Sequence, residues 1–482
     1  MKRKIISISM TLVLCCVLAA CSTENSTVSS ESASTGFDET TSAISSESSK
    51  SSESTVTVSE DTAASAQSSK SSESTITSSE AAAPATYDEV IEQYGDVFGG
   101  LTLQQMQEDV DYLWKTMQDN YPLWGLLQRR GIDAEALYNE TRQALTGISG
   151  DYEFYNQIGK FIRQFKGIGH LSLVSDNSYH GFHNRYKTYL EKNPNMKKIQ
   201  ILYEGLNEPV SIQGYANLEK LEEQLAALNG SEEQSENVDL ESVFADNPTF
   251  NILEPDRIAY IKVPIMKDTP QAHSQFIDFY AKIAGFEHLI IDITGNSGGN
   301  SYYWVQYIAA PNLSQPTSTE QIIMIPDSQT VAEYVQSVDS GRKLLPVSQL
   351  PELPGLEQDD LEQLAYFYIN KSTYEPTGES PFSGKIWVLI DGRVCSSSEA
   401  FALFCKSTGF ATLVGTQSRG DSGGIDAQFF ALPNSGLVVR FHTIYPTNAD
   451  GSCNTEYGTM PDFVSPDGET PLETCLKLIE SE

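Results

Sequence analysis

The chain has 482 residues and a formal net charge of −34 at neutral pH. That length allows two or three domains and a large buried core. The charge argues against a nucleic-acid partner, because phosphate binding needs clustered Lys and Arg, and against electrostatic attachment to an anionic membrane surface.

The first 21 residues have the features of a signal peptide. A basic start at residues 2–4 precedes an apolar stretch, residues 5–17, that is too short for a comfortable membrane-spanning helix. Small residues then lead directly to Cys21, an arrangement that resembles the bacterial lipobox. We expect Cys21 to be lipidated and acyl chains to hold the mature protein at the extracellular face of the bacterial cell membrane. The alternative is an ordinary signal peptide that happens to contain cysteines.

Residues 22–86 are rich in Ser, Thr, Ala and Glu, and "SSKSSESTVTVSE" recurs there as "SSKSSESTITSSE". Such a segment buries too little apolar surface to offset its chain entropy. The composition therefore predicts a disordered tether that lifts a folded body off the membrane.

A helical cap subdomain is predicted for residues 87–168, and a core for residues 169–482. Met106, Val110, Leu113 and Met117 recur at three- and four-residue steps, which is typical of an amphipathic helix. Further helices are expected to begin near residues 132 and 151. His170 follows, between a glycine and an alternating strand; a lone histidine there is more often structural than catalytic.

The pattern of the core alternates between strands and helices. We predict strands at residues 257–263 and 287–293 around a helix at 269–284. The second strand runs into "DITGNSGGNS", where a Gly-Gly pair lets backbone N–H groups face a ligand. A plain tight turn would have the same sequence pattern. Beyond it we expect a helix near 361–368, strands at 427–432 and 436–445, and a final helix at 472–479.

Residues 385–424 organise the core. A buried strand at 386–390 is followed by a turn, the cluster "SSSEA", a helix ending near 409, and a second strand at 411–414. The spacing of Ser396 and Glu399 matches a capping box. Ser396 then stands at a helix start, where unpaired N–H groups and the helix dipole stabilise negative charge. The competing interpretation is that the serines only cap the helix.

Four segments in order, "GIGHLSL", "LIIDITGNSGGN", "VLIDGRVCSSSEAFA…GFATLVG" and "EYGTMPDFV", together resemble the tail-specific (carboxyl-terminal processing) serine peptidase family, which includes the tricorn core protease. The resemblance implies an α/β fold with a crotonase-like (ClpP/crotonase-type) core sheet flanked by helices and an N-terminal helical cap. It also implies that Ser396 is the nucleophile, and that the N–H of Ser397 with that of Gly298 or Gly299 forms the oxyanion hole.

The base cannot be the lysine of the processing branch, because Asp421 occupies that position. The tricorn-like branch uses a histidine instead, which implies His170 as general base and Glu456 as the carboxylate that orients it. The expected activity is that of a serine-type endopeptidase acting on a peptide or protein substrate, with no metal or other cofactor.

Several alternatives stay open. Ser422 lies in "GDSGG", the nucleophile motif of chymotrypsin-like proteases, and Cys395 directly precedes Ser396. The absent lysine, together with retinoid-binding relatives of the family, suggests an inactive protein that binds a peptide or an apolar ligand on the same fold. The cysteines of the body fit neither a zinc site nor a disulfide scaffold.

Overall fold

The computed structural model describes residues 86–229, 248–377 and 382–482. The predicted signal peptide, Cys21 and nearly all of the predicted tether lie outside these residues, so both segments stay predictions. Within the three ranges, no helix is both long enough and apolar enough to cross a membrane.

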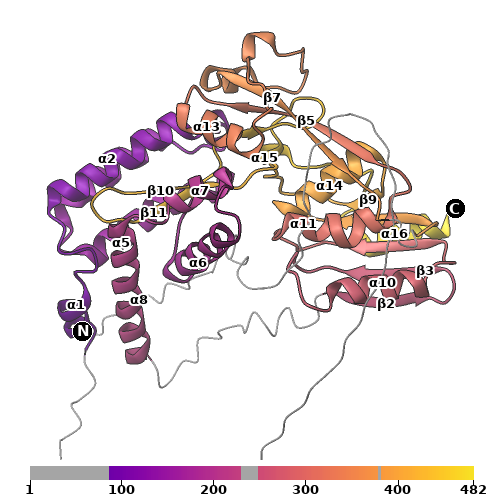
Figure 1. Ribbon diagram of the computed structural model, residues 1–482, viewed down its shortest axis with the longest axis horizontal. Helices are drawn as coiled ribbons and strands as arrows, with labels where there is room; N and C mark the ends of the chain where they lie inside the picture. The colour runs from indigo at the N-terminus through magenta and orange to yellow at the C-terminus, as the bar shows by residue number, and fades with distance from the viewer. Residues whose placement is uncertain (1–85, 230–247, 378–381) are drawn as a thin grey trace, which may run out of the picture. The chain divides into compact units, whose positions relative to one another are not determined.

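Helices build the N-terminal region (Figure 1). They are α1 (Tyr87–Tyr94), α2 (Leu103–Asn120), α3 (Trp124–Arg129), α4 (Ala134–Ala144) and α5 (Asp151–Arg163). Thr102 caps α2, and the predicted stripe of Met106, Val110, Leu113 and Met117 is buried. The predicted helical region is therefore confirmed.

Helices also follow His170, in a stretch whose sequence has little pattern. They come after the short strand β1 (Ser172–Leu173) and are α6 (Asp176–Lys192), α7 (Lys197–Glu204) and α8 (Pro209–Asn229). Of these three, the sequence predicts only a helix at residues 218–228, which is part of α8. Sequence analysis did not predict α6, on which Tyr179 and Tyr186 are buried and Phe182 and Leu190 are partly buried against the core.

A six-stranded sheet forms the core, with the order β13-β9-β8-β4-β3-β2. Its strands are β2 (Thr249–Glu254), β3 (Ile258–Lys262), β4 (His288–Asp292), β8 (Lys385–Ile390), β9 (Thr412–Gly415) and β13 (Phe463–Val464). Every neighbouring pair is parallel except β2 with β3. The fold is thus α/β, as predicted; the finer crotonase-like assignment stays a prediction.

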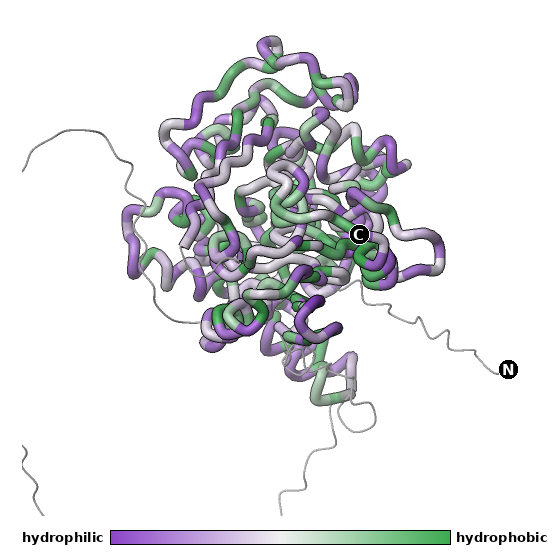
Figure 2. Tube along the Cα trace, turned by 90° about the vertical axis from the view of Figure 1, so that its right-hand side faces the viewer, coloured by the Kyte–Doolittle hydropathy of each residue, from purple (hydrophilic) through white to green (hydrophobic). Residues whose placement is uncertain are grey.

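Helices cover both faces of this sheet, as parallel sheets require. Leu289 and Ile291 pack with α10 (Ala272–Lys282), α11 (Ser301–Trp304) and α14 (Ser397–Thr408) on one face. Ile290 and Leu389 pack with α16 (Pro471–Glu480) on the other. Figure 2 shows hydrophobic stretches of the trace mostly toward the middle of the molecule, and many of the outer loops are hydrophilic.

Two further sheets complete the described chain. One has the order β12-β5-β7-β6, built from β5 (Thr317–Ile325), β6 (Leu345–Pro346), β7 (Tyr366–Tyr374) and β12 (Tyr445–Pro446), with α13 (Gln329–Val338) beside it. The other is β1-β11-β10, built from β1, β10 (Gln428–Ala431) and β11 (Val438–Phe441). A π-helical turn at Val305–Ala309 joins α11 to the short helix α12 (Ala310–Asn312), and a further short helix, α15, spans Asn454–Tyr457.

The predicted helix at residues 361–368 is wrong. A short 3-10 turn at Gln358–Gln363 leads directly into β7, which pairs along its whole length with β5. Aromatic and β-branched residues favour a strand there.

Candidate active site

The predicted strand–turn–helix–strand unit is present, with β8 and β9 parallel neighbours and α14 between them. Ser396 is the N-cap of α14, with φ 59° and ψ −119°. A non-glycine residue at such a φ is strained by about 1–3 kcal/mol and persists only where the surroundings enforce it. The half-buried Ser396 side chain makes no cap hydrogen bond.

The predicted capping box is therefore wrong. The carboxylate of Glu399 accepts hydrogen bonds from Asn454 Nδ2 at 2.8 Å and Thr459 Oγ1 at 2.6 Å instead of reaching back to Ser396. Because the Ser396 side chain does not cap the helix, its hydroxyl is left available for other chemistry.

The glycine-rich loop after β4 meets Ser396, because β4 and β8 are adjacent parallel strands whose carboxyl ends share one edge. A Cβ on Gly298, whose φ is 112°, would lie 2.9 Å from Ser396 Cβ and 3.1 Å from Ser397 N. The N–H of Gly298 donates to Asn296 Oδ1 at 2.8 Å. Of the three predicted oxyanion-hole donors, Gly298 is thus already engaged, while Ser397 begins a helix and has no intrahelical acceptor.

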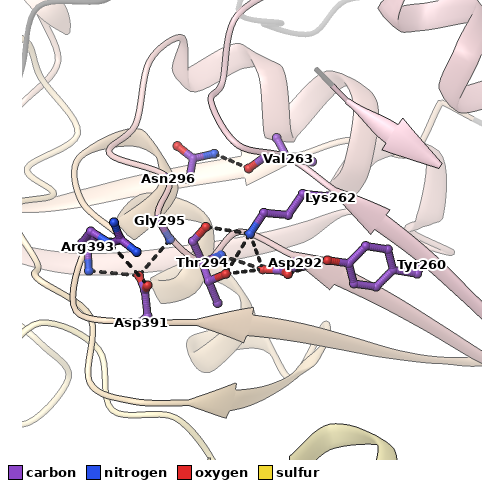
Figure 3. A network of polar contacts seen from close by, with 9 residues as sticks. All are labelled: Tyr260, Lys262, Val263, Asp292, Thr294, Gly295, Asn296, Asp391 and Arg393. Atoms are coloured by element: carbon purple, nitrogen blue, oxygen red, sulfur yellow. Dashed lines mark hydrogen bonds and ion pairs between the residues drawn. The ribbon is translucent and has the colours of Figure 1, made fainter. Parts of the chain in front are cut away.

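A polar network anchors the start of this loop (Figure 3). Lys262 Nζ donates to Asp292 Oδ1 at 2.9 Å and to the carbonyl of Thr294 at 2.7 Å. Gly295 N–H donates at 2.9 Å to Asp391 Oδ1, from the turn that follows β8. The network therefore ties the loop after β4 to the loop that carries Ser396.

His170 reaches the site from the end of the helical region. It has φ 58° and immediately precedes the strand pair β1–β11, in which Ser172 lies opposite Arg440. Continuing that antiparallel register places His170 opposite His442. The N–H of His442 donates to the carbonyl of Gly169 at 2.7 Å, and the two imidazole rings lie 4.2 Å apart between centroids.

Asp421 lies between the two histidines. Its Oδ2 is 2.6 Å from His170 Nδ1, and its Oδ1 is 3.1 Å from His442 Nδ1. All three side chains are buried. The contact with His170 is short but is not aligned as a hydrogen bond.

The backbone brings Ser396 to this cluster. Its N–H donates to the carbonyl of Gly420 at 3.2 Å, and Gly420 directly precedes Asp421. In the part of the chain that the structure describes, no hydrogen bond joins the Ser396 hydroxyl to His170. Catalytic hydrogen bonds are often long or poorly aligned until substrate is bound, so a missing hydrogen bond in the unliganded protein is compatible with a catalytic pair.

Burial is the main influence on the titration of this cluster. It lowers the pKa of His170 to about 4, against the attraction of Asp421 and with help from His442 and Arg440. Burial opposes ionisation of Asp421, but His170 and His442 together outweigh it and hold the pKa of Asp421 well below its usual range. At neutral pH the site thus contains a neutral imidazole beside a carboxylate, as a general base requires.

Glu456 does not lie where sequence analysis placed it. Its carboxylate pairs with Arg129, whose Nη2 is 2.7 Å from Glu456 Oε2 and 2.8 Å from Asp360 Oδ2. The predicted contact with His170 is therefore corrected: Asp421 makes it. The sequence pointed to Asp421 only as the residue in place of a lysine, and it gave no motif for His442.

The other candidate nucleophiles are buried. Ser422 donates its N–H to Asn454 Oδ1 at 3.0 Å, and Cys395 is 1% exposed. Among the described residues, Cys395, Cys405, Cys453 and Cys475 are buried and form no disulfide.

His170, Asp421 and His442 are also possible metal ligands, since one ligand atom from each lies within 4.8 Å of the others. Two ligands of one tetrahedral zinc ion, however, lie about 3.3 Å apart. The 2.6 Å between His170 and Asp421 is a direct carboxylate–imidazole contact that would have to open to admit an ion.

A cavity of about 330 Å³ adjoins the cluster. Its walls come from α3 and the turn after it, the loop before His170, the loop carrying Asp421, and α15. The lining residues are Leu126, Arg130, Lys166, Gly167, Ile168, Gln417, Ser418, Arg419, Asp421, Thr455 and Glu456.

Residues 257–465 match the profile of peptidase family S41. Among solved structures, the chain is similar to a putative peptidase from Parabacteroides merdae, with 18% identity over 78% of this chain and 96% of that chain and a TM-score of 0.48. It is similar to mature CPAF, with 12% identity over 75% and 92% of the two chains and a TM-score of 0.45. The tricorn protease matches over 46% of this chain and 18% of its own, with 19% identity and a TM-score of 0.28. No curated protein matches the sequence.

Proposed function

We propose that this chain, in which residues 257–465 form a domain of peptidase family S41, is a serine-type endopeptidase with Ser396 as its nucleophile. The observation that supports the proposal is the buried 2.6 Å contact between His170 Nδ1 and Asp421 Oδ2. Asp421 directly follows Gly420, whose carbonyl accepts a hydrogen bond from the N–H of Ser396. A nucleophilic serine needs a base that a third group orients.

In this mechanism His170 turns Nδ1 to Asp421, which leaves Nε2 to take the proton of Ser396 Oγ as that oxygen attacks the peptide carbonyl. Asp421 stabilises the imidazolium that forms. The imidazolium then gives its proton to the leaving amine, and water hydrolyses the acyl-enzyme with His170 again as base.

The negative oxygen of the tetrahedral intermediate would form at the start of α14. The N–H of Ser397 and the helix dipole stabilise charge there. Gly299 is the better second donor, since the N–H of Gly298 is already held by Asn296. Removing one such donor typically costs about 100-fold or more in rate.

The proposed location at the extracellular face of the cell membrane is based on sequence features. The basic start, the apolar stretch and Cys21 support a lipid anchor, and residues 22–86 support a tether. Peptides or proteins at the extracellular face of the cell membrane are the substrates that this placement would offer.

Labelling with a fluorophosphonate tests the nucleophile. The purified protein should be labelled and should cleave peptides, and Ser396→Ala should abolish both, whereas Ser422→Ala should retain both. Labelling that survives in Ser396→Ala would refute the assignment. A protein that is never labelled, yet binds peptide or an apolar ligand, would favour the non-catalytic alternative.

A further inference from the structure

Asp421 has an unusual backbone conformation that its neighbours hold in place. Its φ is 70°, a left-handed value that is uncommon for residues other than glycine and persists where the surroundings enforce it. On one side, the carbonyl of Gly420 accepts a hydrogen bond from the N–H of Ser396 at 3.2 Å. On the other side, Ser422 donates its N–H to Asn454 Oδ1 at 3.0 Å. These two bonds together fix the direction in which the Asp421 side chain leaves the loop.

The segment formed by residues 454–459 packs directly on this loop. A Cβ on Gly420 would lie 1.9 Å from the carbonyl oxygen of Asn454, so the two backbones touch and leave no room for a side chain. At the other end of the segment, Ser418 donates its N–H to the carbonyl of Thr459 at 3.1 Å. Thr459 in turn donates its N–H to Ser418 Oγ at 2.6 Å. The segment therefore holds the loop at two places.

One buried carboxyl anchors both ends of the segment. Glu399, in the first turn of α14, accepts at Oε1 from Asn454 Nδ2 at 2.8 Å and from Thr459 Oγ1 at 2.6 Å. All three side chains are buried, so breaking either bond leaves a buried polar group unsatisfied. The amide of Asn454 thus connects two parts of the candidate active site. Its nitrogen binds the helix that begins after Ser396, and its oxygen binds the backbone after Asp421.

The carboxylate of Asp421 depends on this backbone for its position. Thr455 Oγ1 donates to Asp421 Oδ1 at the long distance of 3.4 Å, and the contact with His170 is not aligned as a hydrogen bond. Misplacing a catalytic group by about 1 Å can cost about 100-fold in rate. The bonds that hold the loop therefore bear directly on how well Asp421 orients His170.

We propose that Asn454 is a positioning residue of the peptidase, which keeps the carboxylate of Asp421 directed at His170. Glu399 is its anchor on α14. This inference rests on the proposed function. It also gives the segment around Glu456 a role in the active site that does not require Glu456 to contact the histidine.

Asn454→Ala tests this role, because it removes the contacts of both amide atoms. The kcat for cleavage of a quenched fluorescent peptide should fall by about 30-fold or more, while KM changes by less than about threefold. In the Asp421→Asn background the same substitution should lower kcat by less than about a further threefold, because Asn454 acts through Asp421. Equal losses in the two backgrounds would indicate a merely structural effect and would overturn the proposal.

Exchanging the two polar groups provides a rescue. Asn454→Asp alone places two carboxyls in contact and should lower kcat at about pH 8 by about tenfold or more. Adding Glu399→Gln moves the amide to α14 and the carboxyl to the segment, and it keeps an acceptor for the N–H of Ser422. The double variant should have a kcat at least about threefold above that of Asn454→Asp. A smaller recovery contradicts the assignment.

Asn312→Ala is the matched control. The buried side chain of Asn312 also has two backbone partners, since it accepts from the N–H of Phe382 at 2.9 Å and donates to the carbonyl of Ile308 at 2.8 Å. Its loss should lower the free energy of unfolding but leave kcat within about twofold of the wild type. A fall in kcat equal to that of Asn454→Ala would overturn the proposal.

A milder variant serves if circular dichroism shows that Asn454→Ala does not fold. Thr459→Val keeps the shape of the side chain and removes one of the two hydrogen bonds to Glu399. It should lower kcat by about threefold or more in the wild type and have almost no effect in the Asp421→Asn background. Equal effects in the two backgrounds count against the positioning role.

The inference can fail separately from the peptidase. If the wild type cleaves no peptide, the proposed function is wrong, and a crystal structure of Asn454→Ala, or of Thr459→Val, decides the question of position. Loss of the contact between Asp421 Oδ2 and His170 Nδ1, which is 2.6 Å in the wild type, supports the positioning role. A contact that persists unchanged in the variant refutes it.

Discussion

The buried carboxyl of Glu399 should make the stability of this protein depend on pH between about pH 4.5 and 7. Glu399 lies in the first turn of α14, is fully buried, and has one oxygen, Oε2, without a hydrogen-bond partner. Burial raises its pKa from 4.5 to about 7, against hydrogen bonds from Ser418, Thr459 and Asn454.

The size of the effect follows from that shift. A displacement from 4.5 to about 7 is about 2.5 units, and at about 1.4 kcal/mol per unit it is worth about 3 kcal/mol. Because the pKa is higher in the folded state, this stability is fully present below about pH 4.5 and is lost as pH rises to about 7.

Glu399→Gln removes the titration while keeping the shape of the side chain. Relative to the wild type, the variant should gain about 3 kcal/mol of unfolding free energy between pH 4.5 and pH 8. Urea unfolding at pH 4.5, 6, 7 and 8, followed by circular dichroism, measures this gain. Glu480→Gln, at an exposed position of α16, serves as the control. Parallel pH curves for wild type and Glu399→Gln would refute the reasoning.

The remaining predictions concern catalysis. Asp421→Asn should lower kcat for peptide cleavage by about 10³-fold or more, whereas Glu456→Gln should change kcat by less than about tenfold. A larger loss in Glu456→Gln than in Asp421→Asn would instead identify Glu456 as the residue that orients His170. His442→Gln should move the acidic limb of kcat/KM to higher pH, because His442 lowers the pKa of His170; an unmoved limb with reduced rate would indicate a purely structural role. Gly298→Ala should slow fluorophosphonate labelling by about 100-fold or more, because its Cβ would lie 2.9 Å from that of Ser396; unchanged labelling would show that the loop is not packed against the nucleophile.

Local patterns determined much of this protein from sequence. The apolar stripe of α2 and the strand–turn–helix–strand unit around Ser396 are short-range features, and periodicity and turn chemistry encode them directly. The helix α6 and the strand β7 were not predicted from sequence, because their burial depends on partners far along the chain.

The tertiary structure alone decided which groups lie beside His170. His170 and His442 face each other because β1 pairs with β11 in one register, and Asp421 contacts both rings. The carbonyl of the preceding residue, Gly420, accepts a hydrogen bond from the N–H of Ser396. Glu456 was assigned from a motif, but the ion pair with Arg129 holds it elsewhere. Pairing of distant strands and competition between charged partners are long-range effects, so residue order alone could not reveal that Asp421 is the carboxylate beside His170.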